Sequence, residues 1–268
     1  MRGQRRKLQK QGTRGSPRAA NEGNETGAEE AGDDEERGIM EGFPVELIGN
    51  ILSHLDDMKD VVRASWTCRK WRVALRYLHT LCASWTKREL ETERLEFVLT
   101  DTILQTIDCP DLEEVVVDTC EQVWATVQCF LLKPSSKLRK LQLYGIPLGG
   151  NHPVNLNLGT IPCLFPCLTH LGLSNTMLGN NSPIVESQFQ GSTVFEGVQF
   201  FELRYPVLDE DLVLLMGRVL KRCPNLKKLQ VVGTMDMDCR YMHDFMPSFV
   251  ALVRKFSKVD FQFEKVIY

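Results

Sequence analysis

The sequence predicts an α+β protein in which a small helical unit precedes a short β/α solenoid. Two observations carry this prediction. Between residues 44 and 78 the apolar residues recur at intervals of three and four, which is the spacing of amphipathic helices. From residue 112 onward the spacing changes to an alternation typical of strands, and this alternation returns along the chain as it does in repeat proteins.

The helical unit begins at Pro44, because proline has a fixed φ and no N–H and therefore suits the first turn of a helix. A first apolar stripe follows at Leu47, Ile48, Ile51, Leu52 and Leu55. Asp60 is expected to cap a second helix. The second stripe comprises Val61, Ala64, Cys68, Trp71, Leu75 and Leu78. Helices this short cannot bury all their apolar faces against one another, so the surplus must rest on a neighbouring domain or a partner.

The order and spacing of these residues resemble the F-box motif. The residues that match are Pro44, Glu46, Leu47, Ile51, Leu52, Leu55, Asp60, Val61, Cys68, Arg69, Lys70 and Trp71. Phe43 and Thr67 depart mildly from the motif, and Trp66 is unusually large. The resemblance implies a three-helix unit over residues 39–86 that docks on the Skp-type adaptor of a cullin-RING ubiquitin ligase. It implies adaptor contacts at Phe43, Pro44, Leu47, Ile51, Leu52, Leu55, Val61, Val62 and Trp71. The alternative is that these are ordinary core helices of one globular domain.

The second half of the chain repeats one apolar phrase, in which a first apolar anchor is followed by others three and five positions later. The second anchors are residues 115, 141, 171, 201, 229 and 259, which lie 26 to 30 residues apart. Leu95 and Phe97 fit a degenerate opening unit. This period matches long leucine-rich repeats, each made of a short strand and a helix or a looser return. The prediction is a leucine-rich-repeat-like solenoid over residues 87–268, and the alternative is an α/β domain without repeats.

The spacers between the strands agree in part with such repeats. Helical composition predicts helices at 101–108 and 121–132, and a capped helix from Asp209 to Arg222. The spacers 145–166 and 174–197 are rich in Gly, Asn and Pro and are expected to be loops. The phrases around Cys109-Pro110, Cys223-Pro224 and Cys120 resemble the cysteine-containing leucine-rich repeats that often follow F-boxes.

In a solenoid of this kind the residues between the anchors line the concave face. Target contacts are therefore expected at Tyr144, His170, Phe200, Glu202, Arg204, Lys228 and Gln230. The last repeat is assigned to Phe256, Val259, Phe261 and Phe263, and its outward residues to Lys258, Asp260 and Gln262. No capping helix is expected after this strand, so its edge is expected to be exposed. The alternative is that residues 240–268 fold back as a cap.

Composition limits the function classes. The net charge of −3 carries no global signature of nucleic-acid binding, and no apolar run is long enough to span a membrane. The nine cysteines are unevenly spaced and are expected to be reduced, buried thiols of a protein in the cytoplasm or nucleus. Zinc at Cys163 and Cys167, with His152 or His170, is the alternative, but the ligand spacing is poor. We expect no cofactor and no bound metal.

Residues 1–38 form a charged tail, with a basic half up to residue 20 and an acidic half from residue 21 to residue 36. Too little apolar surface is present to offset the entropy of ordering, so this tail is expected to be disordered. Arg5, Arg6, Lys7 and Lys10 leave nuclear import or anion binding open, beside a tail that is merely solvated.

No spacing of histidines, cysteines or glycines in the sequence indicates a catalytic site or a phosphate loop. The sequence therefore predicts a non-enzymatic substrate receptor of an SCF-type ubiquitin ligase, with an adaptor, a cullin and an unidentified protein target as partners. The alternatives are a non-ligase scaffold whose helices only cap the solenoid, and nucleic-acid binding through the basic tail, which the composition does not favour.

Overall fold

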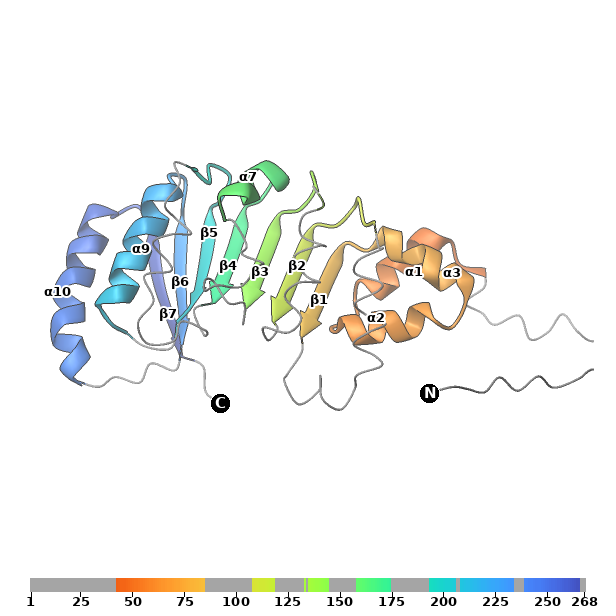
Figure 1. The fold of residues 1–268 in the computed structure, drawn as a ribbon, viewed down its shortest axis with the longest axis horizontal. Coiled ribbons are helices and arrows are strands. Elements are labelled where there is room, and N and C mark those ends of the chain that lie inside the picture. The colour runs from red at the N-terminus through yellow and green to blue at the C-terminus, as the bar shows by residue number, and fades with distance from the viewer. Residues whose placement is uncertain are drawn as a thin grey trace, which may run out of the picture. The chain divides into compact units, whose positions relative to one another are not determined.

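The computed structural model describes residues 42–84, 108–118, 133, 135–144, 158–174, 193–205, 208–233 and 239–265 (Figure 1). All of them belong to one compact unit, Met40–Tyr268. Three short helices come first along the chain, and strands interspersed with further helices follow, which agrees with the coarse form of the predicted fold class. None of the helices in these ranges is long and apolar enough to cross a membrane.

Three short helices, α1 (Val45–Leu52), α2 (Met58–Ser65) and α3 (Arg69–Ala74), precede a 3-10 turn at Leu75–Tyr77. Pro44 occupies the N-cap of α1. The predicted cap of the second helix is wrong, because Asp57 rather than Asp60 caps α2. The extended backbone of Asp57 lets its carboxylate accept a hydrogen bond from the Lys59 N–H at 2.9 Å. Asp60 lies in the first turn and pairs with Arg63.

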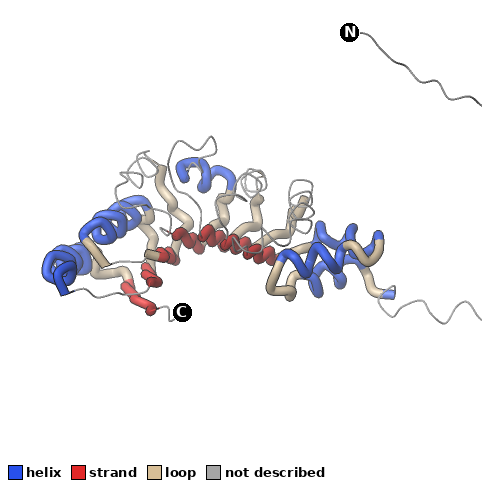
Figure 2. The backbone as a smooth tube through the Cα atoms, turned by 60° about the horizontal axis from the view of Figure 1, so that its bottom comes forward, coloured by secondary structure: helices blue, strands red, loops and turns tan. Residues whose placement is uncertain are grey.

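The strands form one sheet in sequence order, and every neighbouring pair is parallel. Figures 1 and 2 show the strands side by side, with α7, α9 and α10 all on one side of the row. A parallel sheet in sequence order requires each connection to return on the same side, which is what a repeat of strand and return segment produces. The strands are β1 (Thr80–Ser84), β2 (Glu114–Asp118), β3 (Lys140–Tyr144), β4 (His170–Ser174), β5 (Phe200–Arg204), β6 (Lys228–Gly233) and β7 (Asp260–Lys265).

The pattern of apolar residues does not predict the opening strand. β1 lies at residues that were assigned to the helical unit, and Leu78-x-x-Leu81-x-Ala83 carries the repeated phrase. Leu81 and Ala83 align with the anchors Val115 and Val117 of β2, and β1 pairs directly with β2. Leu95, Phe97, Cys120 and nearly all of the helices predicted at 101–108 and 121–132 lie outside the described residues.

The closing strand is present, but its predicted register is wrong by two residues. Leu229 aligns with Phe261 rather than with Val259, so Asp260, Gln262 and Glu264 take the outward positions and Lys258 precedes the strand. A shift of two residues preserves the alternation of faces, and the hydrophobic pattern alone therefore could not detect it.

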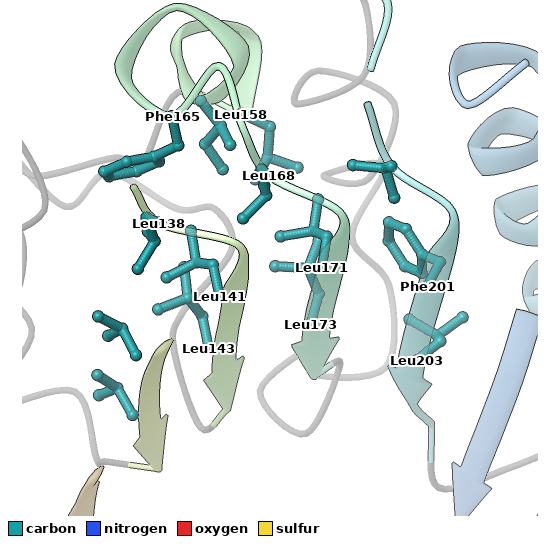
Figure 3. Packing of buried hydrophobic residues seen from close by; sticks show 14 of the residues in the cluster. Leu138, Leu141, Leu143, Leu158, Phe165, Leu168, Leu171, Leu173, Phe201 and Leu203 are labelled. Carbon is teal, nitrogen blue, oxygen red and sulfur yellow. The ribbon is translucent and has the colours of Figure 1, made fainter. Parts of the chain in front are cut away.

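The core lies on the side of the sheet that carries the helices. Figure 3 shows the anchors of β3, β4 and β5 in register, with Leu158 and Phe165 beside them. Leu141, Leu171 and Phe201 are fully buried. The helix α7 (Ile161–Leu164) and the 3-10 turn Leu158–Thr160 occupy a spacer that was predicted to be a loop. The buried apolar residues of this spacer, Leu158, Ile161 and Phe165, explain why it orders.

Two longer helices cover the last strands. α9 (Glu210–Arg222) follows the predicted cap, because the Asp209 carboxylate accepts a hydrogen bond from the Leu212 N–H at 2.8 Å. α10 (Cys239–Lys255) packs on α9, and its Phe249 ring meets the Phe261 and Phe263 rings edge-on at 5.8 and 5.1 Å. Within the described part of the chain, β7 has β6 as its single strand neighbour, and four of its six residues are exposed.

Candidate functional site

The helical unit is fixed to the first strands by hydrogen bonds. The Ser53 hydroxyl accepts from the His79 backbone N–H at 2.9 Å and donates to the Gly49 carbonyl at 3.0 Å. The Cys109 thiol donates to the Leu75 carbonyl at 3.3 Å. The helices and the strands share one hydrophobic cluster that runs from Ile48 to Phe245. These contacts therefore fix the orientation of the sheet's outer face relative to α1, α2 and α3.

An apolar stripe on α1 faces away from this cluster. Ile48 and Leu52 are fully buried, whereas Pro44 is exposed, Leu47 is 42% exposed and Ile51 is half-buried. Pro44, Leu47 and Ile51 stand three and four positions apart and so share one side of the helix. We call these three residues the α1 stripe. An exposed apolar stripe beside a packed core is the ordinary feature of a helix that binds a partner.

The remaining predicted adaptor contacts lie elsewhere. Leu52, Val61 and Val62 are 0%, 4% and 4% exposed, so they pack the helices together rather than offer a surface. Phe43, Leu55 and Trp71 are half-buried against the same cluster. Two exposed apolar residues of the helices were not assigned a contact from sequence: Trp66 at 52% and Val73 at 44%. The unusual size of Trp66 within the motif was the signal for the first of them.

The second candidate surface is the strand face, which we define as the side of the sheet opposite the helices. Among the predicted target contacts, the structure joins Tyr144, Glu202 and Arg204. The Arg204 guanidinium lies over the Tyr144 ring, 3.4 Å from its centroid. The Tyr144 hydroxyl donates to Glu202 Oε1 at 2.7 Å, and Arg204 Nε donates to the same oxygen at 3.2 Å.

Gly172 makes room for this cluster. A Cβ at Gly172 would lie 2.8 Å from Gln142 Cγ and 2.8 Å from the Tyr144 hydroxyl oxygen. Because β4 carries no side chain there, Gln142 and Tyr144 on β3 reach Glu202 on β5, and Gln142 Nε2 donates to Glu202 Oε2 at 2.9 Å. Arg204 extends the cluster to Asp118 on β2, where the separation is 3.1 Å.

This packing corrects the role predicted for Tyr144. The residue is 1% exposed, so it supports the cluster from below instead of touching a target. Burial and the neighbouring Glu202 carboxylate raise the pKa of Tyr144 well above its usual range, so the phenol keeps its proton and remains a hydrogen-bond donor. Arg204 and Asp118, whose side chains are 38% and 50% exposed, are the members of the cluster that face outward.

His170, Phe200 and Lys228 form a second cluster, where β4, β5 and β6 begin. The His170 and Phe200 rings lie 5.3 Å apart, and Lys228 Nζ lies 5.0 Å from the Phe200 ring centroid. Burial, and then the nearby Lys140 cation, lower the pKa of His170, so its imidazole is neutral at pH 7. Gln230, the last predicted contact, donates to Glu264 at 2.6 Å.

In the part of the chain that the structure describes, neither surface gathers the ligands of a metal site. No three His, Cys, Asp or Glu residues come together to hold a metal ion in the described ranges. Cys163 and Cys167 are both exposed, and His152 lies outside those ranges. The arrangement suits protein binding: one apolar helix stripe, and one strand face with charged and aromatic side chains held in position.

The thiols differ sharply in their expected reactivity. Burial raises the pKa of both Cys109 and Cys223 to about 12, whereas Cys163 and Cys167 are exposed. We expect iodoacetamide at pH 8 to label Cys163 and Cys167 rapidly and to label Cys109 and Cys223 only after unfolding. Peptide mass spectrometry over a time course measures this directly. Equal labelling rates at Cys109 and Cys167 in the folded protein would contradict the burial of Cys109.

Two similarities to known proteins bear on this chain. The F-box-like family model matches residues 40–81, a range that contains α1, α2 and α3 and ends within β1. The chain is also 35% identical over 199 residues to an F-box/LRR-repeat protein, At1g67190, from Arabidopsis thaliana. The chain therefore contains an F-box-like domain at residues 40–81 and is a homologue of an F-box/LRR-repeat protein. The match covers 72% of the present chain and 44% of the Arabidopsis protein, so the chain spans under half of that F-box/LRR relative's length.

Proposed function

We propose that this F-box/LRR homologue is a substrate-receptor subunit of an SCF-type cullin-RING ubiquitin ligase. In this proposal the F-box helices dock on a Skp-type adaptor, and through the adaptor on a cullin. The observation that carries it is the α1 stripe, because Pro44 and Leu47 are exposed and Ile51 is half-buried within the residues that match the F-box-like family. F-box domains in general bind Skp-type adaptors.

The sheet and its helices act as a leucine-rich-repeat solenoid that recruits a protein target. Seven parallel strands in sequence order and a repeated anchor phrase support this interpretation. The proposed division places the charged tail at residues 1–38, the F-box unit at 39–86 and the solenoid at 87–268. Because β1 belongs to the sheet, the residues after Leu78 serve both the F-box unit and the first repeat.

The proposed mechanism is proximity. The chain contributes no chemical step of its own, and a separate enzyme transfers ubiquitin to a target that the strand face holds at raised effective concentration. The bonds of Ser53 and Cys109 support this role, because a fixed joint keeps the target at a constant distance from the adaptor. The proposed site of action is the cytoplasm or the nucleus.

The α1 stripe provides the test of adaptor docking. Leu47→Asp places a charge at an apolar contact, so we expect affinity for a Skp-type adaptor to fall by at least about tenfold. Leu214→Asp is the matched control, because Leu214 is 57% exposed on α9, away from the F-box helices. Co-purification of each variant with the adaptor is the measurement.

Three outcomes bear on the choice between the receptor and a non-ligase scaffold. Loss of the adaptor with Leu47→Asp but not with Leu214→Asp supports docking through the α1 stripe. If both variants retain the adaptor equally well, the α1 stripe is not the docking surface. If the wild-type chain retains none, the helices serve only to cap the sheet.

A further inference from the structure

We propose that an acidic, extended segment of the protein target binds across the starts of β3, β4, β5 and β6. The site, which we call the cationic row, comprises Arg139, Lys140, His170, Phe200, Lys227 and Lys228. This inference rests on the proposed function, because it takes the strand face to be the target-binding surface, and it names the chemistry of the target.

All charged residues of the row are cationic. At the start of each of the four neighbouring strands β3 to β6, two residues lie along the row: Arg139-Lys140, Thr169-His170, Gln199-Phe200 and Lys227-Lys228. These eight positions hold four cations and no carboxylate. The Glu114 carboxylate on β2 pairs with Lys140 and offsets part of its charge. Arg139 and Lys227 are exposed, and they provide the attraction together with Lys228.

The backbone keeps the row in register. The Arg139 carbonyl accepts from the Thr169 and His170 N–H groups, and the Gln199 carbonyl accepts from the Lys227 and Lys228 N–H groups. These bonds hold the charged residues of adjacent strands at one level before any partner arrives. A preordered row loses less entropy on binding than a set of flexible surface lysines.

Phe200 supplies an apolar contact at the centre of the row. Its half-buried ring lies between His170 and Lys228, with the separations given above. His170 is neutral at pH 7 because its pKa is lowered, so the imidazole adds a flat, uncharged surface rather than a further cation. An aromatic ring beside the Lys228 cation suits a segment that combines carboxylates with one apolar side chain.

The rest of the strand face determines how such a segment lies. Asp118, Glu202 and Glu264 occupy the middle and far levels of the same face, and they would repel an acidic chain that ran along the strands. The segment therefore crosses the strands. Adjacent strands lie about 4.8 Å apart, so β3 to β6 span about 14 Å, which an extended chain covers in about five residues.

Carboxylates at both ends of the row favour a peptide over a nucleic acid. The cationic row occupies only the start of each strand, and it ends at Glu114 on β2 and Asp260 on β7. A polynucleotide carries phosphates over a broader track and would meet these acids, whereas a short acidic peptide would not.

The test uses a fluorescein-labelled peptide of about ten residues, composed of Glu and Asp with one central Leu, and the full-length chain. Fluorescence anisotropy measures its affinity at low salt. We expect Lys227→Glu with Lys228→Glu to weaken binding at least about tenfold, because each substitution replaces attraction with repulsion. The matched control is Lys221→Glu with Arg254→Glu, which makes the same change of net charge on exposed positions in the last turns of α9 and α10.

The outcomes separate this inference from the proposed function. A loss confined to the Lys227 and Lys228 variant supports the cationic row, and adaptor co-purification should be unchanged in both variants. An equal loss of peptide affinity in the Lys221 and Arg254 control variant would show that binding depends on net charge alone, and it would overturn the inference. Equal affinity for a single-stranded oligonucleotide of the same charge would also overturn it.

A milder variant guards against misfolding. Lys227→Gln with Lys228→Gln keeps both positions polar. We expect it to weaken peptide binding by a smaller factor than the glutamate variant does and to leave the circular dichroism spectrum unchanged. Undiminished binding in both double variants would show that the peptide binds elsewhere, whatever the adaptor does.

Discussion

Phe201→Ala is expected to lower the free energy of unfolding by about 3–5 kcal/mol, which is a large share of the stability of a protein of this size. Phe201 is fully buried on β5, where it aligns with Leu171 of β4 and Leu229 of β6. Removing the ring leaves a cavity between two strands that their hydrogen bonds hold at a fixed separation, so the site cannot collapse fully. Urea unfolding followed by circular dichroism measures the effect.

The preceding residue provides the control. Phe200 is half-buried on the strand face, so Phe200→Ala should cost less than about 1 kcal/mol, since no cavity forms. The same pair of substitutions tests which side of the sheet is the core. If Phe200→Ala were the more damaging change, the alternation of faces described here for β5 would be inverted.

Gly49→Ala is expected to destabilise the helical unit by about 3 kcal/mol and to abolish adaptor binding. A Cβ at Gly49 would lie 2.5 Å from the Tyr77 Cβ and 2.8 Å from the Ala74 carbonyl oxygen. Neither atom belongs to the flexible end of a side chain. The α1 helix must therefore move away from α3 and from Tyr77, and the Ser53 link to His79 would be strained with it.

Gly217→Ala is the matched control on α9. A Cβ there meets Leu252 Cδ1 at 3.5 Å, an ordinary contact, and alanine favours a helix over glycine by about 1 kcal/mol. We expect this variant to be as stable as the wild type or slightly more so. Thermal unfolding of the two variants, with adaptor co-purification, gives the comparison. A Gly49→Ala protein with normal stability would show that α1 and α3 are not in the close contact seen here.

The local pattern of apolar residues was sufficient to predict most strands, but not the two at the ends of the sheet. The anchors of β2 to β6 alternate strictly, and each occupies the predicted position. β1 was missed because Trp71, Leu75 and Leu78 continue a helical spacing up to the residue where the strand phrase begins. In β7 the alternation extends over Val259, Phe261 and Phe263, so the register depended on the pairing with β6.

The candidate surfaces were harder to predict, because exposure depends on residues far apart in the sequence. Tyr144 was assigned to a contact surface, yet it is buried, because Gly172 opens a space on β4 and Arg204 covers the ring from β5. The F-box motif likewise does not separate Leu47 from Leu52. Only the packing of α1 shows that the first faces outward and the second inward.

The most direct measurement is the binding of the purified chain to a purified Skp-type adaptor by isothermal titration calorimetry. We predict a one-to-one complex with a negative heat-capacity change, because the α1 stripe buries apolar surface on docking. The Leu47→Asp chain should bind at least about tenfold more weakly under the same conditions. A folded wild-type chain that releases no heat and does not co-elute with the adaptor would contradict the proposal that this protein is a ubiquitin-ligase receptor.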